Sequence, residues 1–208
     1  MIKIYLASAS PRRKEILELM KLDFEVATAE ADESVGEGLS KGEIGEALAA
    51  KKAFALKEKL KAENKFDSET VIIAADTLVW CDGECLGKPS DQNEALEMLA
   101  KLSGKAHNVC TGTCILYGEK SVSSFEISDV YMRKISIDTA LTYIATGEPL
   151  DKAGAYGIQG IGSVLVDRIE GDFFSVMGLS PKTVCKLLGA LGIPYFDLLI
   201  KRLKKNEI

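Results

Sequence analysis

Strand-like segments that follow one another without a helix between them limit the folds open to this chain. Val109–Tyr117 and Val122–Met132 are two long strand-like segments in succession, and Thr70–Trp80 leads into the turn signal Asp82-Gly83. An Asp-Gly pair after an apolar run is typical of a β-hairpin, in which the two strands are antiparallel. Helical segments lie between other strands. We therefore expect an α/β fold with a mixed, twisted sheet and flanking helices, rather than a purely parallel sheet.

Helix-start signals separate several of these strands. Ser10 precedes Pro11 and is expected to cap a helix, because proline at the first helical position loses no hydrogen bond. Ser40 and Glu43 have the spacing of a capping box for a long helix that ends near Leu60. Further helices are expected to begin at Asp91, Ser136 and Ser180. The first helix should bury an apolar stripe of Ile16, Leu17, Leu19 and Met20.

The charge and hydropathy of the chain restrict its function classes. It has 208 residues, a formal net charge of −5 and 47% hydrophobic residues, which suits one domain with a buried core, built as one lobe or two. An acidic chain is poorly suited to nucleic acid or a membrane surface, because both attract basic faces. No apolar run approaches bilayer-spanning length, and no secretion signal precedes the first strand. We expect a cytoplasmic protein that binds neither nucleic acid nor membrane.

The cysteines and the single histidine offer little chemistry. Five cysteines, an odd number, fit a reducing compartment. Cys81 and Cys85 share a spacing with Cys110 and Cys114, so a zinc site competes with buried small side chains. Structural zinc pairs usually lie closer together in sequence, which favours burial. No nucleophile elbow accompanies His107, so we assign it a structural role.

The strongest functional signal lies near the start of the chain. The apolar segment Ile2–Ala7 gives way to Ser8 and Ser10, and a helix start follows with Arg12 and Arg13 in its first turn. Backbone N–H groups at a helix start, hydroxyl donors and guanidinium groups together favour a phosphate-rich anion. Because the chain as a whole is acidic, this local concentration of donors and positive charge predicts an anion site.

Other charged residues are ambiguous when taken singly. Asp76 directly follows a buried strand, where it could bind a divalent cation, act as a general base or cap a turn beside Thr77. Asp32 and Glu33 lie among other acids and, alone, are typical of a solvated acidic loop. Lys52 lies on the long helix, where a lysine usually faces solvent.

Two glycine-containing segments add candidate binding groups. Gly83–Ser90 looks like a Walker A motif but lacks one spacer residue, and Pro89 separates Lys88 from the serine, so we reject a P-loop. Lys88 stays a candidate phosphate-binding lysine held in a fixed turn. In Asp151–Gly160, glycines allow a ligand close to the backbone, and Gln159 offers a donor and an acceptor to a nucleobase edge. The alternative for this segment is a glycine-rich turn between strands.

Five motifs follow one another along the chain: Leu6–Arg13, Ala75–Thr77, Gly87–Pro89, Leu102–Gly104 and Asp151–Gly160. Five motifs in order are far more specific than any one of them. Together they resemble the Maf family, the septum-formation-inhibitor-like nucleoside triphosphate pyrophosphatases. The resemblance runs from about residue 3 to residue 191 and predicts a single domain over residues 1–208, with no motif in the tail 193–208.

This resemblance implies a two-lobed α/β structure, similar to inosine-triphosphatase-like enzymes, with a cleft between the lobes. The cleft would take a nucleoside triphosphate with Mg²⁺ or Mn²⁺ and release the monophosphate and pyrophosphate. A homodimer is a further family expectation. The alternative hypothesis is a non-catalytic nucleotide-binding regulator of septum formation and cell division.

The resemblance also implies roles for individual residues. Asp76 corresponds to the proton acceptor that activates the water attacking the α-phosphorus. Glu33 and Asp76 would hold the metal, and Asp32 could share that role. Ser8 and Ser10 would add hydrogen-bond donors. The cations that would neutralise the triphosphate are Lys52, Lys88 and Arg13, which fits a reaction that depends on positioning and charge stabilisation.

Substrate choice in the family depends on the residues near Arg12, Thr77 and Gln159. The branch that acts on dTTP and UTP resembles this chain, which has two arginines after the proline and a glutamine in the glycine-rich segment. The branch that acts on 7-methyl-GTP carries an acidic residue at the glutamine position. A methylated guanine is cationic and suits a carboxylate, whereas a neutral uracil or thymine edge suits an amide. The resemblance therefore implies dTTP and UTP as substrates, together with modified pyrimidine triphosphates.

Overall fold

The computed structural model describes residues 2–206, which group into two compact units. Within the described residues, unit 1 comprises residues 2–76, Thr111–Glu126 and residues 178–206. Unit 2 comprises Thr77–Cys110 and Ile127–Met177. Each unit is therefore built from segments that are far apart in the sequence.

Seven strands within the described residues form one sheet: β1 (Lys3–Leu6), β2 (Glu25–Val26), β3 (Thr70–Cys81), β4 (Glu84–Leu86), β5 (Ala106–Tyr117), β6 (Lys120–Met132) and β7 (Val166–Glu170). Their order is β2-β1-β3-β5-β6-β7, with β4 paired to β3. β1 runs parallel to β2 and β3, whereas the β3–β4 and β6–β7 pairs are antiparallel. The mixed sheet predicted from the hairpin signals is confirmed.

The described residues also form the helices α1 (Pro11–Leu19), α2 (Lys41–Ala62), α3 (Gln92–Leu102), α4 (Ile137–Ala145), α5 (Phe173–Met177), α6 (Pro181–Ala190) and α7 (Tyr195–Asn206). Three short 3-10 helices accompany them: η1 (Glu148–Asp151), η2 (Ala153–Ala155) and η3 (Ile161–Leu165). The sequence patterns did not predict α5. Over the part of the chain described, no single helix is long and apolar enough to cross a membrane, although α6 and α7, bent by 95°, pass that test of length and composition as a pair.

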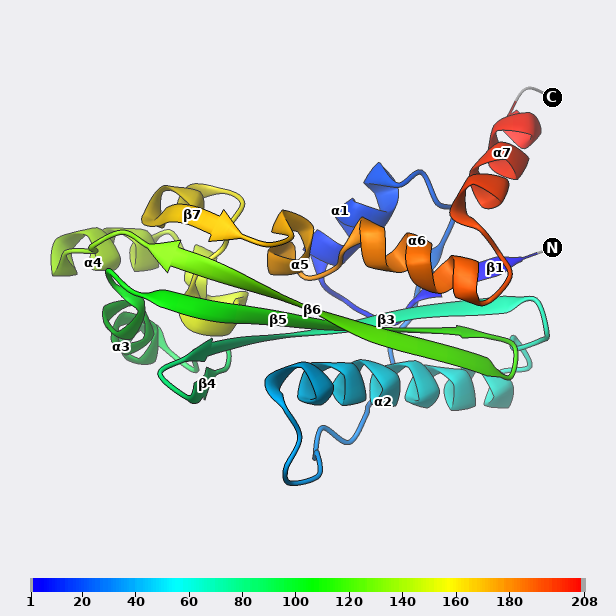
Figure 1. The fold of residues 1–208 in the computed structure, drawn as a ribbon, viewed down its shortest axis with the longest axis horizontal. Coiled ribbons are helices and arrows are strands. Elements are labelled where there is room, and N and C mark those ends of the chain that lie inside the picture. The colour runs from blue at the N-terminus through cyan, green and yellow to red at the C-terminus, as the bar shows by residue number, and fades with distance from the viewer. Residues whose placement is uncertain (1, 207–208) are drawn as a thin grey trace. The chain divides into compact units, whose positions relative to one another are not determined.

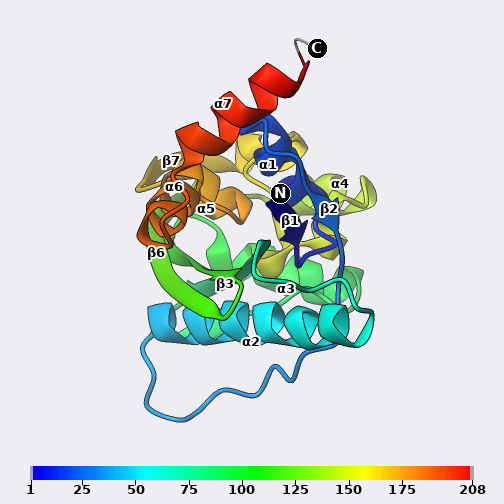
Figure 2. The same cartoon turned by 90° about the vertical axis from the view of Figure 1, so that its right-hand side faces the viewer.

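In unit 1, α2 covers one face of the sheet, and α1 and α6 cover the other (Figure 1, Figure 2). The buried stripe of α2 contains alanines and leucines that share a core with side chains of β1, β3 and β5. Small residues let the helix come close, because a Cβ added to Gly112 of β5 would lie 2.1 Å from the backbone of Gly45 on α2. The buried α2 residues of this core are Ala49, Ala53, Leu56 and Leu60.

In unit 2, α3 packs against α4 and η2. Gly147, with a φ of +75°, lies in the left-handed region that favours glycine and follows the end of α4. The backbone N–H of Gly154 donates a 3.0 Å hydrogen bond to the carbonyl of Gly87. This bond ties the glycine-rich segment to the turn that follows β4.

The helix starts expected from polar caps are confirmed at four positions. Ser40 and Glu43 form the complete capping box of α2, in which each side chain accepts the other residue's backbone N–H. Asp91, Ser136 and Ser180 each accept a backbone N–H from the first turn of α3, α4 and α6 respectively.

Three local predictions are wrong. Asp76 does not follow a strand but lies inside the long strand β3, where Lys52 compensates its charge. Ser10 occupies the cap position of α1, but its side chain makes no cap bond, and its backbone N–H donates to the Ser8 hydroxyl, 3.2 Å away. Leu19 is 62% exposed, since it lies to one side of the buried residues of α1.

Candidate active site

One ammonium group joins two carboxylates in unit 1. Lys52, on α2, bonds to Oδ1 of Asp76 on β3, and its Nζ lies 3.1 Å from Oε1 of Glu33. The side chains of Asp76 and Lys52 are 12% and 24% exposed, so solvent screens this pair less than a surface pair. The bond from Lys52 to Oδ1 orients the carboxylate of Asp76.

The neighbouring acid, Asp32, has a different partner set. Its carboxylate accepts hydrogen bonds from the N–H and hydroxyl of Ser34, at 2.9 and 2.6 Å, and lies 3.0 Å from Nζ of Lys51. The bonds from Ser34, followed by that from Lys51, hold the pKa of Asp32 well below its usual range. The sequence left open which acid of this loop joins the site. In the structure Glu33 reaches Lys52, whereas Asp32 fixes the loop to α2.

The N-terminal anion motif forms a hydrogen-bonded cluster. Arg13 donates from Nη1 to the hydroxyl of Ser8, 3.1 Å away, and from Nε to the carbonyl of Gly178, 2.8 Å away. Burial lowers the pKa of Arg13 to about 10, and the charge of Asp76 opposes that shift, so Arg13 is a cation at neutral pH. The Ser8 hydroxyl also accepts the N–H of Ser10, which leaves its own proton to donate.

Arg12 lies on the first turn of α1 and is partly exposed. Its positive charge also lowers the pKa of Arg13, after the larger effect of burial. Two positively charged guanidinium groups at one helix start favour the binding of a polyvalent anion.

The carboxylates of this cluster fit a hard divalent cation in part. Among residues 2–206, no group of three or more His, Cys, Asp or Glu side chains could hold a metal ion. Asp76 and Glu33 nevertheless converge on one point, the Lys52 ammonium. Mg²⁺ is commonly bound by one or two carboxylates together with water and substrate phosphates. The donor set therefore suits a metal that arrives with a phosphate-bearing substrate.

The remaining predicted site residues belong to unit 2. Lys88 is exposed in the turn after β4, and Thr77 is partly buried on β3. Since side chains alternate along a strand, Thr77 points to the opposite face from Asp76. Gln159 lies between η2 and η3 and is partly buried. A common role for these three residues and the unit 1 cluster stays a prediction.

Two glycines that the sequence patterns did not single out bring α2, the helix that carries Lys52, close to β5. Gly45 lies two helical turns before Lys52 on α2, on the same side of the helix, and it contacts Gly112. Glycine inside a helix costs about 1 kcal/mol relative to alanine, so its presence there was a signal of close packing.

His107 is structural, as predicted. It is 3% exposed, and its Nε2 shares a 2.7 Å hydrogen bond with the hydroxyl of Tyr156. Its Nδ1 is buried without a partner among the described residues. Burial lowers the pKa of His107 to about 4, so the ring is neutral at pH 7.

The five cysteines form no disulfide in the described chain. Cys81, Cys110 and Cys114 are buried as expected for small apolar side chains, and burial raises the pKa of Cys114 to about 12. Cys85 is exposed on β4, which corrects the expectation of burial for that residue, because β4 pairs only with β3.

We predict that His107 makes the protein less stable in mild acid. Between pH 6.5 and about 4 the unfolded chain binds the proton that the folded chain excludes, so protonation favours unfolding. The loss amounts to about 3 kcal/mol over that interval. His107→Gln cannot titrate, so the difference in unfolding free energy between wild type and variant should shrink as pH falls. Urea unfolding at pH 7 and pH 4.5 measures it, and a constant difference would contradict the prediction.

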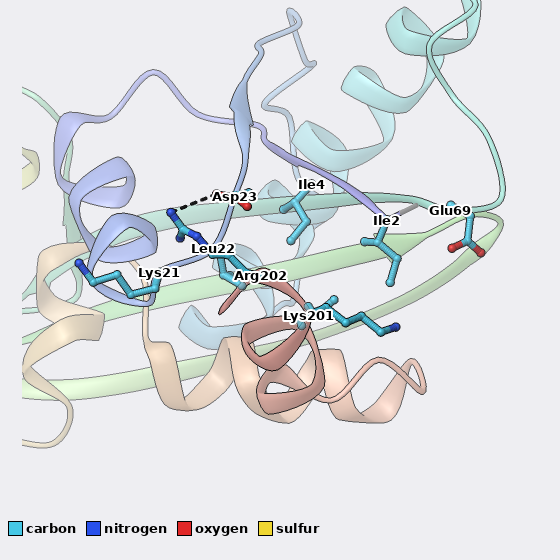
Figure 3. A pocket seen from close by; sticks show the side chains of 9 residues that line it. Ile2, Ile4, Lys21, Leu22, Asp23, Glu69, Lys201 and Arg202 are labelled. Carbon is cyan, nitrogen blue, oxygen red and sulfur yellow. Dashed lines mark ion pairs between the residues drawn. The ribbon is translucent and has the colours of Figure 1, made fainter. Parts of the chain in front are cut away.

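A separate cavity of about 420 Å³ lies in unit 1 among β1, the segment after α1 and α7 (Figure 3). The apolar residues Ile2, Ile4 and Leu22 are part of its lining. Two charged lining residues, Arg202 and Asp23, form a 3.1 Å ion pair. None of the predicted site residues lines this cavity.

Known proteins are similar to this chain over most of its length. A "dTTP/UTP pyrophosphatase" of Caldicellulosiruptor bescii is 46% identical over 201 residues, which are 96% of this chain and 98% of that protein. A protein of the same name from Bacillus cereus strain B4264 is 47% identical over 86% of this chain and 90% of its own length. Another, from Acetivibrio thermocellus, is 43% identical over 93% and 97%.

A solved structure, that of the Staphylococcus aureus Ham1 protein, is similar with a TM-score of 0.46 and 12% identity over 99% of this chain and 100% of that chain. A likeness at that level carries no argument. The family model described as Maf-like protein, in contrast, matches residues 3–191, the range over which the five motifs occur. The chain belongs to the Maf-like protein family.

Proposed function

We propose that this chain hydrolyses dTTP and UTP to the nucleoside monophosphate and pyrophosphate. The observation that carries the proposal is the pairing of the Lys52 ammonium with the carboxylates of Asp76 and Glu33. The charge of Asp76 also acts on Arg13. The chain is 46% identical to a dTTP/UTP pyrophosphatase. A carboxylate that is held in place is suited to accept a proton from water. Fixed cations around it are suited to the charge of a triphosphate.

Asp76 acts as the general base in this proposal. The Lys52 ammonium bonds to Oδ1, which orients the carboxylate to take the proton of the attacking water. A positioned general base contributes about 10²- to 10⁴-fold to a rate. The water then attacks the α-phosphorus, and pyrophosphate leaves.

Charge stabilisation comes from groups that the fold holds in place. Arg13 is braced by Ser8 and the carbonyl of Gly178, so its position changes little when an anion binds. Lys52 carries one positive charge between two carboxylates. The three groups together have a net negative charge, which favours the binding of a cation. A divalent metal, Mg²⁺ or Mn²⁺, held by Asp76, Glu33 and phosphate oxygens, would offset the substrate charge and make the bound water more acidic.

Base selectivity is assigned to Arg12, Thr77 and Gln159, and Lys88 is assigned to the phosphates. These assignments depend on the motif resemblance. We also propose modified pyrimidine triphosphates as substrates, a homodimer as the assembly and the cytoplasm as the location.

A panel of nucleoside triphosphates tests the reaction and its selectivity. We expect dTTP and UTP to turn over fastest with Mg²⁺ or Mn²⁺, to release pyrophosphate rather than phosphate, and to stop when the metal is chelated. Chromatography of the nucleotide product, with a coupled pyrophosphate assay, measures all three. Turnover of 7-methyl-GTP alone would contradict the role of Gln159. Release of phosphate would contradict attack at the α-phosphorus.

A further inference from the structure

One carboxylate, that of Glu148, accepts hydrogen bonds from the backbone of the loop that carries Gln159. Glu148, at the start of η1, accepts the backbone N–H of Ile161 through Oε2 and that of Gly162 through Oε1, both at 3.0 Å. These partners lie 13 and 14 residues further along the chain, so the side chain does not cap its own helix. It fixes the segment that directly follows Gln159.

A tyrosine extends this support to the other side of Gln159. The hydroxyl of Tyr143, on α4, donates to Oε1 of Glu148 at 2.9 Å and accepts the N–H of Gly157 at 3.1 Å. Residues 157, 161 and 162 are therefore linked through one Tyr–Glu pair. Gln159 is the midpoint of the segment that this pair holds.

The protonation states suit this arrangement. Burial raises the pKa of the Tyr143 hydroxyl, so it keeps its proton to donate. Burial alone would raise the pKa of Glu148, but the N–H groups of Gly162 and Ile161 and the Tyr143 hydroxyl outweigh it, and the pKa is lowered. An ionised carboxylate that accepts three hydrogen bonds binds its donors more strongly than a neutral acceptor does.

The glycines of the loop fit against this same pair. A Cβ on Gly162 would lie 2.4 Å from the Tyr143 hydroxyl, and a Cβ on Gly160 would lie 2.9 Å from Oε2 of Glu148. Gly160 also has a φ of +79°, a conformation that disfavours other residues. The sequence suggested that the glycines of Asp151–Gly160 admit a ligand. In the structure, Gly160 lies against the protein's own carboxylate, and Gly162, outside that segment, lies against its own hydroxyl.

We propose that Glu148, with Tyr143, is a positioning residue that sets base selectivity by fixing the loop on both sides of Gln159. The proposal rests on the proposed function, since it concerns discrimination among nucleoside triphosphates. Glu148 touches the loop backbone and not the substrate. It acts through the placement of the Gln159 amide, which reads a base edge only if its donor and acceptor are held in register.

Glu148→Gln tests this with almost no change in shape. A glutamine has one oxygen for three donors, and its NH₂ group would face an N–H or O–H group. We expect the ratio of kcat/KM for UTP over CTP to fall about tenfold, mainly through a higher KM for UTP. Tyr143→Phe keeps both backbone bonds to the carboxylate and should lower the ratio less. The double variant should show less than the sum of the two effects.

A second Tyr–Glu pair in unit 2 provides matched controls. Glu170 accepts the Tyr131 hydroxyl at 3.1 Å and pairs with Arg168, on exposed surface of β7. Glu170→Gln and Tyr131→Phe should keep the wild-type ratio. Hydrogen exchange at the amides of Ile161 and Gly162 adds a readout that needs no activity, and it should speed up in Glu148→Gln alone.

The outcomes separate the two proposals. If the wild type hydrolyses neither dTTP nor UTP, the proposed function fails and this inference fails with it. If the wild type is selective and Glu148→Gln keeps both the UTP/CTP ratio and the slow amide exchange, the positioning role alone is overturned. If Glu148→Gln does not fold, Tyr143→Phe decides, and an unchanged ratio in that variant overturns the role.

Discussion

Asp76→Asn should lower kcat for dTTP by about 10³-fold, the largest loss expected from any single substitution in this chain. Asparagine keeps the size of the side chain but cannot take a proton from water. Lys52 keeps Glu33 as a partner 3.1 Å away, so the cluster is not left with an isolated charge. We therefore expect a folded protein that still binds nucleotide. Single-turnover release of pyrophosphate and calorimetric binding of dTTP measure the two properties separately.

Asp67→Asn is the matched control for this prediction. Asp67 precedes the same strand, β3, but its carboxylate bonds to the Thr70 hydroxyl and to the N–H of Glu69. The control should keep wild-type kcat. A loss of less than tenfold in Asp76→Asn would remove Asp76 from the role of general base. A septation phenotype that survives in Asp76→Asn would favour the non-catalytic regulator over the enzyme.

The long strand β3 shows what the sequence could predict and what it could not. The run Val71–Ala75 correctly indicated a buried strand, and Asp82-Gly83 correctly indicated the hairpin. Asp76 was interpreted as the first residue after a strand that ends at Ala75, because the apolar run stops there. The strand continues because Lys52 lies against that carboxylate, and a pairing between residues 24 positions apart is not visible in local patterns.

The two adjacent lysines illustrate the same limit within the site. Lys51 and Lys52 have the same chemistry, and the family motif rather than local pattern singled out Lys52. In the structure they divide between Asp32 and Glu33, and only Lys52 also reaches Asp76. Which lysine faces β3 depends on how α2 is turned against the sheet, a property of packing and not of charge pattern.

The second large effect is expected from Gly112→Ala, because Gly112 is where β5 and α2 pack closely against each other. Gly112→Ala places a Cβ 2.1 Å from the carbonyl carbon and oxygen of Gly45 and 2.3 Å from the N of Glu46. These are backbone atoms, so no side chain can rotate away, and α2 must move by more than an ångström. Overpacking of this kind costs about 1–3 kcal/mol, which lowers the Tm by roughly 2–12 °C in a chain of this size.

Activity should fall further than stability alone explains, because Lys52 lies on the helix that moves. At a temperature where Gly112→Ala is fully folded, kcat should drop at least about tenfold, since misplacement by 1 Å can cost about 10²-fold. Gly189→Ala, on α6 of the same unit, is the control, because its Cβ would meet nothing within 4 Å. It should keep kcat, and its Tm should stay the same or rise, because alanine is favoured over glycine inside a helix. Circular dichroism and pyrophosphate release on the same samples decide the matter. A Gly112→Ala protein with wild-type kcat would show that the Gly45 contact does not position Lys52.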